Sequence, residues 1–127
     1  MKNTTPKRII IFDDDKDILA ICTYILEERD WQVHTFSNCD DIEHKVDGIR
    51  PHVILMDNWI PDVGGITATQ LLKKSDTLKN IPVIYFSANN DIQTLAAQAG
   101  ADSFLAKPFG IDELMHAIDS VVVQPSA

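Results

Sequence analysis

RIIIFDDD, residues 8–15, is the stretch that decides the fold, because a short run of β-branched and aromatic side chains leads directly into three aspartates. No polar residue interrupts the run from Ile9 to Phe12, which predicts a strand buried on both faces, as in a parallel sheet. From Lys16 to about Glu28, apolar side chains recur at helical spacing, and Asp15 is placed to cap the start of that helix. The stretch therefore opens a strand-helix unit.

The same alternation of an apolar run and an amphipathic segment continues along the chain. Further strands are predicted at Gln32–Phe36, His52–Met56, Pro82–Phe86 and Ser103–Ala106. The helices between and after them are predicted at about Cys39–Val46, Ile66–Lys74, Asn89–Ala99 and Ile111–Val123. Strands joined by helical crossovers run parallel, with helices packed on both faces of one sheet. The fold class predicted is α/β, a doubly wound sheet of five strand-helix units.

Length and composition set the class of protein. A chain of 127 residues predicts a single domain, 1–127, with its core over about 7–123 and short polar tails. The net charge of −8 would repel nucleic acid, so direct binding to DNA or RNA is not expected. Neither a signal peptide nor a membrane-spanning run is evident, and the two cysteines have no CxxC pairing. We therefore expect a soluble cytoplasmic protein without a membrane partner.

Polar side chains stand where four of the predicted strands end. Asp13, Asp14 and Asp15 follow the first strand, Asp57 the third, Ser87 the fourth and Lys107 the fifth. In open parallel sheets the ligand site lies outside the carboxyl ends of the strands. We therefore expect three kinds of group, carboxylates, a hydroxyl and an amine, to meet at one edge.

This set of groups indicates phosphoryl chemistry with Mg²⁺. Neighbouring carboxylates repel one another unless a cation is present, and oxygen ligands suit Mg²⁺, which is commonly shared with phosphate. Lys107 and Ser87 would contact the phosphoryl oxygens, and Asp57 would be the nucleophile, forming an acyl phosphate. Each residue alone is explained as well by a turn, a cap or a surface loop. The prediction depends on all of them falling at strand exits.

These residues resemble the receiver domain of two-component response regulators, and the likeness runs from about Lys7 to Val123. It implies a flavodoxin-like sheet with the strand order 2-1-3-4-5. It also implies that Asp13 and Asp14 are the Mg²⁺ residues, together with Asp57 and the backbone carbonyl of Trp59. Asp57 would be the phosphoacceptor.

The resemblance gives further positions a role. Ser87 and Phe104 match the switch residues, Lys107 matches the lysine of the site, and Pro108 stands where the family commonly has a cis peptide bond. Pro61 and Gly65 match the loop that follows the acceptor. Ile60 and Gly64 depart from the commonest pattern but remove no reacting group. Trp59 and Asn89 are hypothesised to set the lifetime of the phosphorylated state.

The function implied is that of a response regulator receiver in a phosphorelay. A sensor histidine kinase or a histidine phosphotransfer protein would dock against the first helix and the loop carrying Pro108 and Phe109, and donate its phosphoryl group. The face formed by the fourth helix, fifth strand and fifth helix would then change shape for an output protein, or for a phosphorylation-linked dimer. The chain would catalyse its own phosphotransfer and dephosphorylation without being a multiple-turnover enzyme. It could act alone or be a receiver of a longer protein.

Other classes of protein remain open at this point. A flavin binder shares the topology, but Asp13 to Asp15 would repel the flavin phosphate. A haloacid-dehalogenase-like phosphatase needs an acid two residues after its nucleophile, where Asp57 has Trp59 but Asp13 has Asp15. A receiver-like interaction module that works without phosphorylation is the main alternative. The histidines, at 34, 44, 52 and 116, share no spacing of metal ligands.

Overall fold

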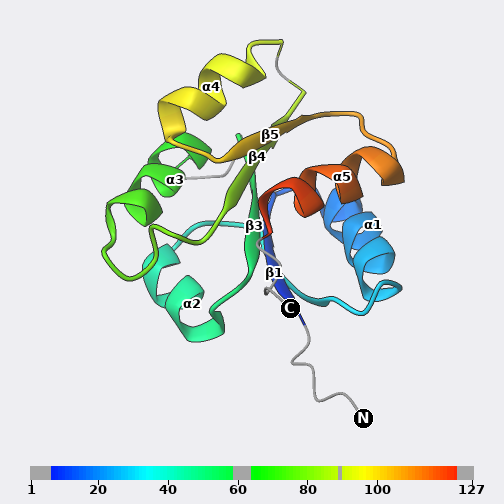
Figure 1. Ribbon diagram of the computed structural model, residues 1–127, viewed down its shortest axis with the longest axis horizontal. Coiled ribbons are helices and arrows are strands. Elements are labelled where there is room, and N and C mark those ends of the chain that lie inside the picture. The colour runs from blue at the N-terminus through cyan, green and yellow to red at the C-terminus, as the bar shows by residue number, and fades with distance from the viewer. Residues whose placement is uncertain (1–6, 59–63, 89, 123–127) are drawn as a thin grey trace.

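Five parallel strands form one sheet with a helix after each strand in a computed structural model that describes residues 7–58, 64–88 and 90–122 (Figure 1). The strands are β1 (Arg8–Phe12), β2 (Gln32–Phe36), β3 (Val53–Asp57), β4 (Val83–Ser87) and β5 (Ser103–Ala106). The helices are α1 (Lys16–Glu27), α2 (Ile42–Ile49), α3 (Gly65–Lys74), α4 (Ile92–Ala99) and α5 (Ile111–Val121). This confirms the predicted α/β class.

The strand order is β2-β1-β3-β4-β5, the flavodoxin-like order that the resemblance implied. Figure 1 shows α1 and α5 on one face of the sheet and α2, α3 and α4 on the other. Side chains of β1, β3 and β4 alternate between two cores, so that Ile9 and Ile11 pack toward α1 and α5 while Ile10 and Phe12 pack toward α2, α3 and α4. Burial of the central strands on both faces explains their uninterrupted apolar sequence.

The register of the strands brings their carboxyl ends to one edge. Phe12 pairs with Met56, Asp57 with Phe86, and Ser87 with Ala106. Asp13, Asp57, Ser87 and Lys107, each the last residue of a strand or the first after one, are therefore neighbours in space although up to 94 positions apart in the chain. The sheet itself assembles the candidate site.

Three strands, β1, β2 and β5, have the predicted bounds, and the prediction for α2 was wrong by three residues at each end. The helix begins at Ile42 because Asp41 has a left-handed backbone, and it continues through Gly48 to Ile49. Arg50, also left-handed, ends it by donating its N–H to the carbonyl of Val46. The guanidinium of Arg8 on β1 binds the carbonyls of Ile49 and Arg50, so this end is fixed by a residue remote in sequence.

The other differences have a local cause. β3 and β4 each begin and end one residue later than predicted, at Val53–Asp57 and Val83–Ser87, and Asp57 and Ser87 both pair in the ladder. α4 begins at Ile92, three residues later than predicted, after Asp91 at its N-cap. The last helix ends at Val121, where Val122 turns to an extended backbone. Within the described residues no helix is both long enough and apolar enough to cross a membrane.

At the amino end of β4, a lysine of α3 binds both the α3–β4 loop and the α4–β5 loop. Lys73 Nζ, at the end of α3, donates to the carbonyls of Lys79 and Ile81 and lies 2.7 Å from Asp102 Oδ2. The same Asp102 oxygen accepts the N–H of Val83, the first residue of β4. This contact explains why Lys73 is largely buried in a chain that exposes most of its charges, and it fixes the α4–β5 connection to the sheet.

His52 gives the fold a pH dependence that can be measured. Its Nδ1 accepts the N–H of Arg8 at 3.0 Å, and burial, with the positive charges of Arg8 and Lys7, lowers the pKa of the imidazole below 6.5. The unfolded chain therefore takes up this proton more readily, so stability is lost as the pH falls below about 6.5. We expect urea unfolding between pH 7 and 5 to show a loss of about 1 kcal/mol from this residue.

The variant His52→Asn isolates that contribution. The Asn side-chain oxygen can accept the same N–H but does not titrate in this range. The variant should lose less stability than the parent between pH 7 and 5, while the two are similar at pH 7. Equal slopes for parent and variant would show that His52 does not contribute.

Candidate functional site

The predicted residues line one cleft at the carboxyl edge of the sheet. It has a volume of about 400 Å³ and is lined by Asp13, Asp14, Asp15, Asp57, Ser87, Ala88 and Lys107. Asp13, Asp57 and Ser87 are buried, whereas Asp14 and Asp15 are exposed. Acidic, hydroxyl and basic side chains from four strand ends thus face a single solvent-accessible hollow.

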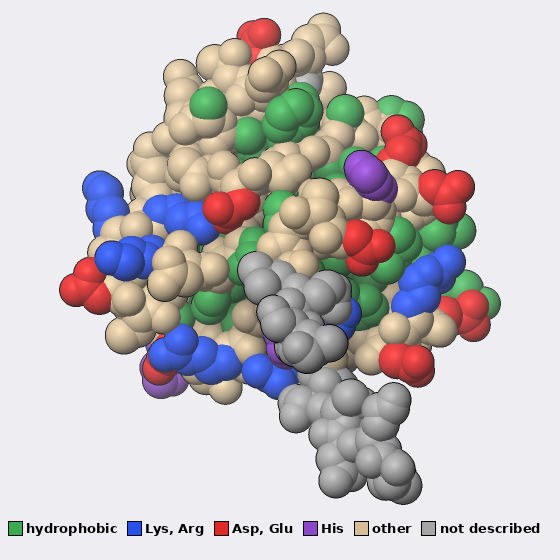
Figure 2. Space-filling model, viewed as in Figure 1, with side chains coloured by type: hydrophobic (Ala, Val, Ile, Leu, Met, Phe, Trp, Pro, Cys, Tyr) green, Lys and Arg blue, Asp and Glu red, His purple; other side chains and the backbone are tan. Residues whose placement is uncertain are grey.

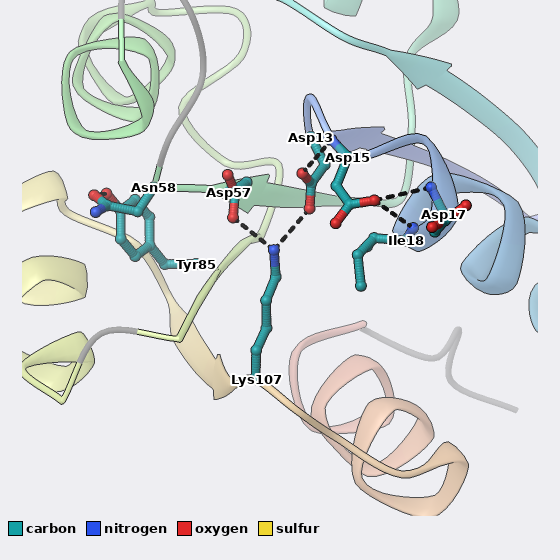
Figure 3. Close-up of polar contacts among 8 residues, drawn as sticks. All are labelled: Asp13, Asp15, Asp17, Ile18, Asp57, Asn58, Tyr85 and Lys107. Atoms are coloured by element: carbon teal, nitrogen blue, oxygen red, sulfur yellow. Dashed lines mark hydrogen bonds and ion pairs between the residues drawn. The ribbon is translucent and has the colours of Figure 1, made fainter.

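Lys107 holds the two buried carboxylates together. Its Nζ lies 2.8 Å from Asp13 Oδ2 and 2.8 Å from Asp57 Oδ1, as Figure 3 shows. The ammonium also stands 4.5 Å from the centre of the Phe86 ring, a cation–π contact from the neighbouring strand. The lysine side chain is 17% exposed, so its pairs with Asp13 and Asp57 are only weakly screened by water.

Burial and the close charges shift the pKa values in this cleft. Burial raises the pKa of Asp13, and the neighbouring charge of Asp57 adds to this, while the bonds from Lys107 and from the Asp15 N–H oppose it. Burial alone would lower the pKa of Lys107, but its bonds to Asp13 and Asp57 outweigh that effect and raise the pKa. Lys107 is therefore protonated at neutral pH and acts as the fixed cation of the site.

Three carboxylates are arranged to share a cation. One oxygen from each of Asp13, Asp14 and Asp57 lies within 4.8 Å of the others. Two of these residues are buried and one is exposed, so the group is open to solvent on one side. Hard, closely spaced oxygen ligands with an open side fit Mg²⁺, which retains water ligands and shares phosphate oxygens. These residues therefore fit the metal that the sequence predicts.

Asp15 does not belong to that group and has the predicted structural role. Its side chain accepts the N–H groups of Asp17 and Ile18 and so caps the start of α1 (Figure 3). The backbone N–H of Asp15 in turn donates to Asp13 Oδ1 at 2.9 Å. The cap thus orients Asp13 as well as the helix.

Ser87 and Phe104 lie on neighbouring strands but differ in solvent exposure. Ser87 is 2% exposed and ends β4, and its carbonyl accepts the N–H of Lys107 at 2.9 Å. Phe104, on β5, is 41% exposed. The two residues that the resemblance assigns to a switch are therefore one buried hydroxyl and one outward-facing ring.

The predicted loop positions divide between described and undescribed residues. The Lys107–Pro108 peptide bond is cis, as expected. Gly65 begins α3 and lies so close to Asp57 that an added Cβ would stand 2.2 Å from the Asp57 carbonyl oxygen. Trp59, Pro61 and Asn89, together with Ile60, lie outside the described residues, so their assigned roles stay predictions.

The sequence reasoning missed Asn58 and Tyr85. The Tyr85 hydroxyl, inside the core, donates to Asn58 Oδ1, and Asn58 directly follows the buried Asp57 (Figure 3). A tyrosine in the otherwise apolar run Val83–Phe86 was the available signal, because a buried phenol requires a partner. Which partner it has depends on the pairing of β3 with β4.

The cysteines and the site are separate. Cys22, on α1, lies in the core between the sheet and the pair α1 and α5. Cys39 lies in the core on the opposite face of the sheet, so the sheet separates the two thiols. Burial raises the pKa of Cys22 to about 11 and that of Cys39 to about 12. Both thiols are protonated and unreactive at neutral pH.

Residues 9–119 match the family model of the response regulator receiver domain, so the chain belongs to the response regulator receiver family of two-component signal transduction. Membership of this family decides against the flavin-binding and phosphatase alternatives. Acidic residues after β1, an aspartate ending β3 and a lysine after β5 are the features that led to the same family from the sequence.

Curated relatives include both kinases and transcriptional regulators. Over 120 residues the chain is 29% identical to the CAI-1 autoinducer sensor kinase/phosphatase CqsS of Vibrio cholerae, covering 92% of this chain and 18% of that protein. It is 31% identical over 119 residues to the DNA-binding dual master transcriptional regulator RpaA of Synechocystis, covering 85% of this chain and 46% of RpaA. The chain spans about half the length of such relatives or less.

Solved structures agree on the fold. The receiver domain of the Francisella response regulator 1452 is 27% identical, with a TM-score of 0.80 over 93% of this chain and 97% of that one. The receiver domain of the sensor histidine kinase PA1611 from Pseudomonas aeruginosa, 22% identical, has a TM-score of 0.85 over 93% and 98%. The latter structure has a magnesium ion coordinated in its active-site cleft.

Proposed function

We propose that this receiver accepts a phosphoryl group on Asp57 from a phosphohistidine of a sensor histidine kinase or a histidine phosphotransfer protein. The observation that carries the proposal is the placement of Asp57 beside Lys107 and Asp13, in an open cleft at the carboxyl edge of the sheet. In the reaction, an Asp57 carboxylate oxygen forms a bond to phosphorus as the bond from phosphorus to the histidine nitrogen breaks. The products are an acyl phosphate and a free histidine.

Asp13, Asp14 and Asp57 would hold Mg²⁺, with a backbone carbonyl of Trp59, which lies outside the described residues, as a further ligand. The ion would neutralise the negative charge of the carboxylates and of the transferring phosphoryl oxygens. Without it, the acidic side chains of the cleft would repel the phosphoryl group. Lys107, protonated and already in contact with Asp57, would bind a phosphoryl oxygen from the other side. Ser87, at the end of the adjacent strand, would donate its hydroxyl to another oxygen.

Those new contacts are the basis of the switch. A phosphoryl group on Asp57 adds anionic oxygens that attract Ser87 and Lys107, and both lie next to β5. Movement of Ser87 toward the phosphate would make room for the exposed ring of Phe104 to turn inward. The α4–β5–α5 face would then differ between the two states, and an output protein or a second copy could bind one of them better.

The donor would dock on the side of α1 and the loop after β5. Ile21 and Tyr24 on α1 are 55% and 67% exposed, which is unusual for large apolar side chains. Figure 2 shows hydrophobic side chains at the surface over α1 and α5, with acidic side chains among them, while Lys and Arg gather over α2 and α3. An apolar surface on α1, the helix that begins directly after Asp15 of the cleft, suits a protein donor that must bring its histidine to Asp57.

The proposal also covers where the domain works and whether it turns over a substrate. Residues 1–127 would form one receiver, working in the cytoplasm either alone or as part of a longer regulator or kinase. It would catalyse its own phosphorylation and dephosphorylation without turning over a separate substrate. Trp59, two residues after Asp57 in the sequence, and Asn89, two residues after Ser87, would set the lifetime of the acyl phosphate.

Intact-mass measurement after incubation with acetyl phosphate and Mg²⁺ tests the proposal directly. We expect one addition of about 80 Da, the mass of a phosphoryl group on a carboxylate, lost in Asp57→Asn and after addition of EDTA. Beryllofluoride binding serves as a second measurement that does not depend on the lifetime of the phosphate. Failure of both would favour an interaction module that works without phosphorylation.

A further inference from the structure

Tyr85 is a buried phenol beside the candidate phosphoacceptor. It lies in the middle of β4, is 0% exposed, and pairs in register with Met56 of β3 and Phe104 of β5. Its hydroxyl donates to Asn58 Oδ1, and the close-up of the site shows the two side chains together (Figure 3). Because the ring is enclosed by the core, the position of the hydroxyl is fixed by the sheet.

Asn58 connects this hydroxyl to Asp57. Asp57 is the last residue of β3, and Asn58 is the first residue after the strand, where ladder pairing stops. The Asn58 carbonyl accepts the N–H of Gly65 at 3.3 Å, a long bond, and Gly65 lies directly against the Asp57 carbonyl. The Tyr85 hydroxyl is thus a side-chain group of β4 that binds the segment directly after β3.

The hydroxyl is a permanent donor. Burial and the nearby charge of Asp57 raise the pKa of Tyr85 to about 12, so the phenol stays protonated over the working range. A buried hydroxyl without a partner costs free energy, and Asn58 Oδ1 satisfies it. The hydrogen bond therefore satisfies the buried phenol and at the same time fixes the Asn58 side chain.

We propose that Tyr85 is a positioning residue for the phosphoacceptor: its hydroxyl fixes the side chain of Asn58, and thereby the backbone from which the Asp57 carboxylate extends. This inference rests on the proposed phosphorylation of Asp57. Tyr85 does not contact the phosphoryl group; it acts through Asn58. Small errors in the position of a reacting group cost large factors in rate, so loss of the hydroxyl should slow phosphorylation while leaving the fold intact.

Tyr85→Phe is the informative change because it removes only the hydroxyl. The ring stays in the core and remains across from Phe104, so the packing of β4 and β5 is retained. We expect its rate of phosphorylation by acetyl phosphate at saturating Mg²⁺, followed by intact mass, to fall roughly tenfold. Asn58→Ala should slow the reaction by a similar factor. The double variant should be no slower than the slower single variant, because both changes remove the same contact.

Amide hydrogen exchange separates positioning from a general loss of stability. In Tyr85→Phe we expect faster exchange at the Gly65 N–H, which is bonded to Asn58. The Ile54 N–H, bonded to the Pro82 carbonyl at the opposite end of β3, should be unchanged. Thr69→Val is the matched control: Thr69 Oγ1 is buried on α3 with no partner from the described residues, so its removal should change neither rate nor exchange.

The outcomes are distinct. A Tyr85→Phe rate within twofold of the parent, or effects of the two single changes that multiply in the double variant, would overturn the proposal. So would equal acceleration of exchange at Gly65 and Ile54. If the parent protein gains no phosphoryl group and binds no beryllofluoride, the proposed function fails, and the exchange at Gly65 still decides whether Tyr85 positions this segment.

Discussion

Replacing Lys107 by Met is expected to lower the free energy of unfolding by about 3 kcal/mol at pH 7, because it leaves two buried carboxylates without their cation. Asp13 and Asp57 both lie 2.8 Å from Lys107 Nζ, so one ammonium group neutralises charge on both. The rate of phosphorylation should fall about 100-fold, since the variant also loses the positive charge beside the acceptor. Urea unfolding and intact mass after acetyl phosphate treatment measure the two effects.

The stability loss should shrink as the pH falls. Burial already raises the pKa of Asp13 above 3.8, and the loss of Lys107 raises it further. A carboxyl whose pKa is higher in the folded state contributes stability below its unfolded value and loses it as the pH rises through the folded value. The variant should therefore approach the parent in acid, where Asp13 is neutral. A loss independent of pH would contradict the assignment of the effect to charge.

Lys74→Met is the control for that variant. Lys74 is the last residue of α3; unlike Lys107 it is exposed, and it makes none of the described ion pairs. An exposed lysine contributes little to stability, so we expect a change below about 0.5 kcal/mol and a phosphorylation rate equal to that of the parent.

Replacing Gly65 by Ala is expected to have the second large effect. The new Cβ would stand 2.2 Å from the Asp57 carbonyl and 3.1 Å from Asn58 Cα, both backbone atoms that cannot rotate away. Either α3 or the end of β3 must move, at a cost of about 3 kcal/mol. Since this movement displaces the acceptor itself, the phosphorylation rate should fall at least about tenfold. Thermal unfolding and the same mass assay test the prediction.

Gly48→Ala provides a matched comparison within the chain. Gly48 lies inside α2, and no atom stands within 4 Å of the position its Cβ would take. The change should raise stability by about 0.5–1 kcal/mol, because alanine loses less backbone entropy in a helix. Opposite signs for the two substitutions would support the close approach at Gly65. A mild effect at Gly65 would show that the strand end and α3 adapt to each other.

Local pattern was sufficient for much of the fold. The apolar runs at residues 8–12, 32–36 and 103–106 are strands with the predicted bounds, and Asp15 caps α1 as its position suggested. These features depend on neighbouring residues only: side-chain periodicity, β-branching and a capping side chain at the right offset. For the same reason the strand exits could be listed before any coordinates, and with them Asp13, Asp57, Ser87 and Lys107.

Local pattern failed where the cause lies elsewhere in the chain. No residue near the end of α2 indicates in the sequence that the helix stops there, because Gly48 lies inside the helix. The carbonyls at that end are bound instead by Arg8 from β1. The need for glycine at 65 follows from the approach of α3 to Asp57, and the need for a hydroxyl at 85 from its bond to Asn58. Each is a contact between segments whose relative position only the packed sheet defines.

The sequence alone thus determined the alternation of strands and helices, the family, and the residues gathered at the carboxyl edge, because parallel strands bring their ends together whatever lies between them. The tertiary structure decided how those residues engage one another: that Lys107 bridges Asp13 and Asp57, that Phe104 faces outward, and that Tyr85 holds Asn58. Such contacts depend on strand register and side-chain packing across 27 to 94 residues of chain, which periodicity does not encode.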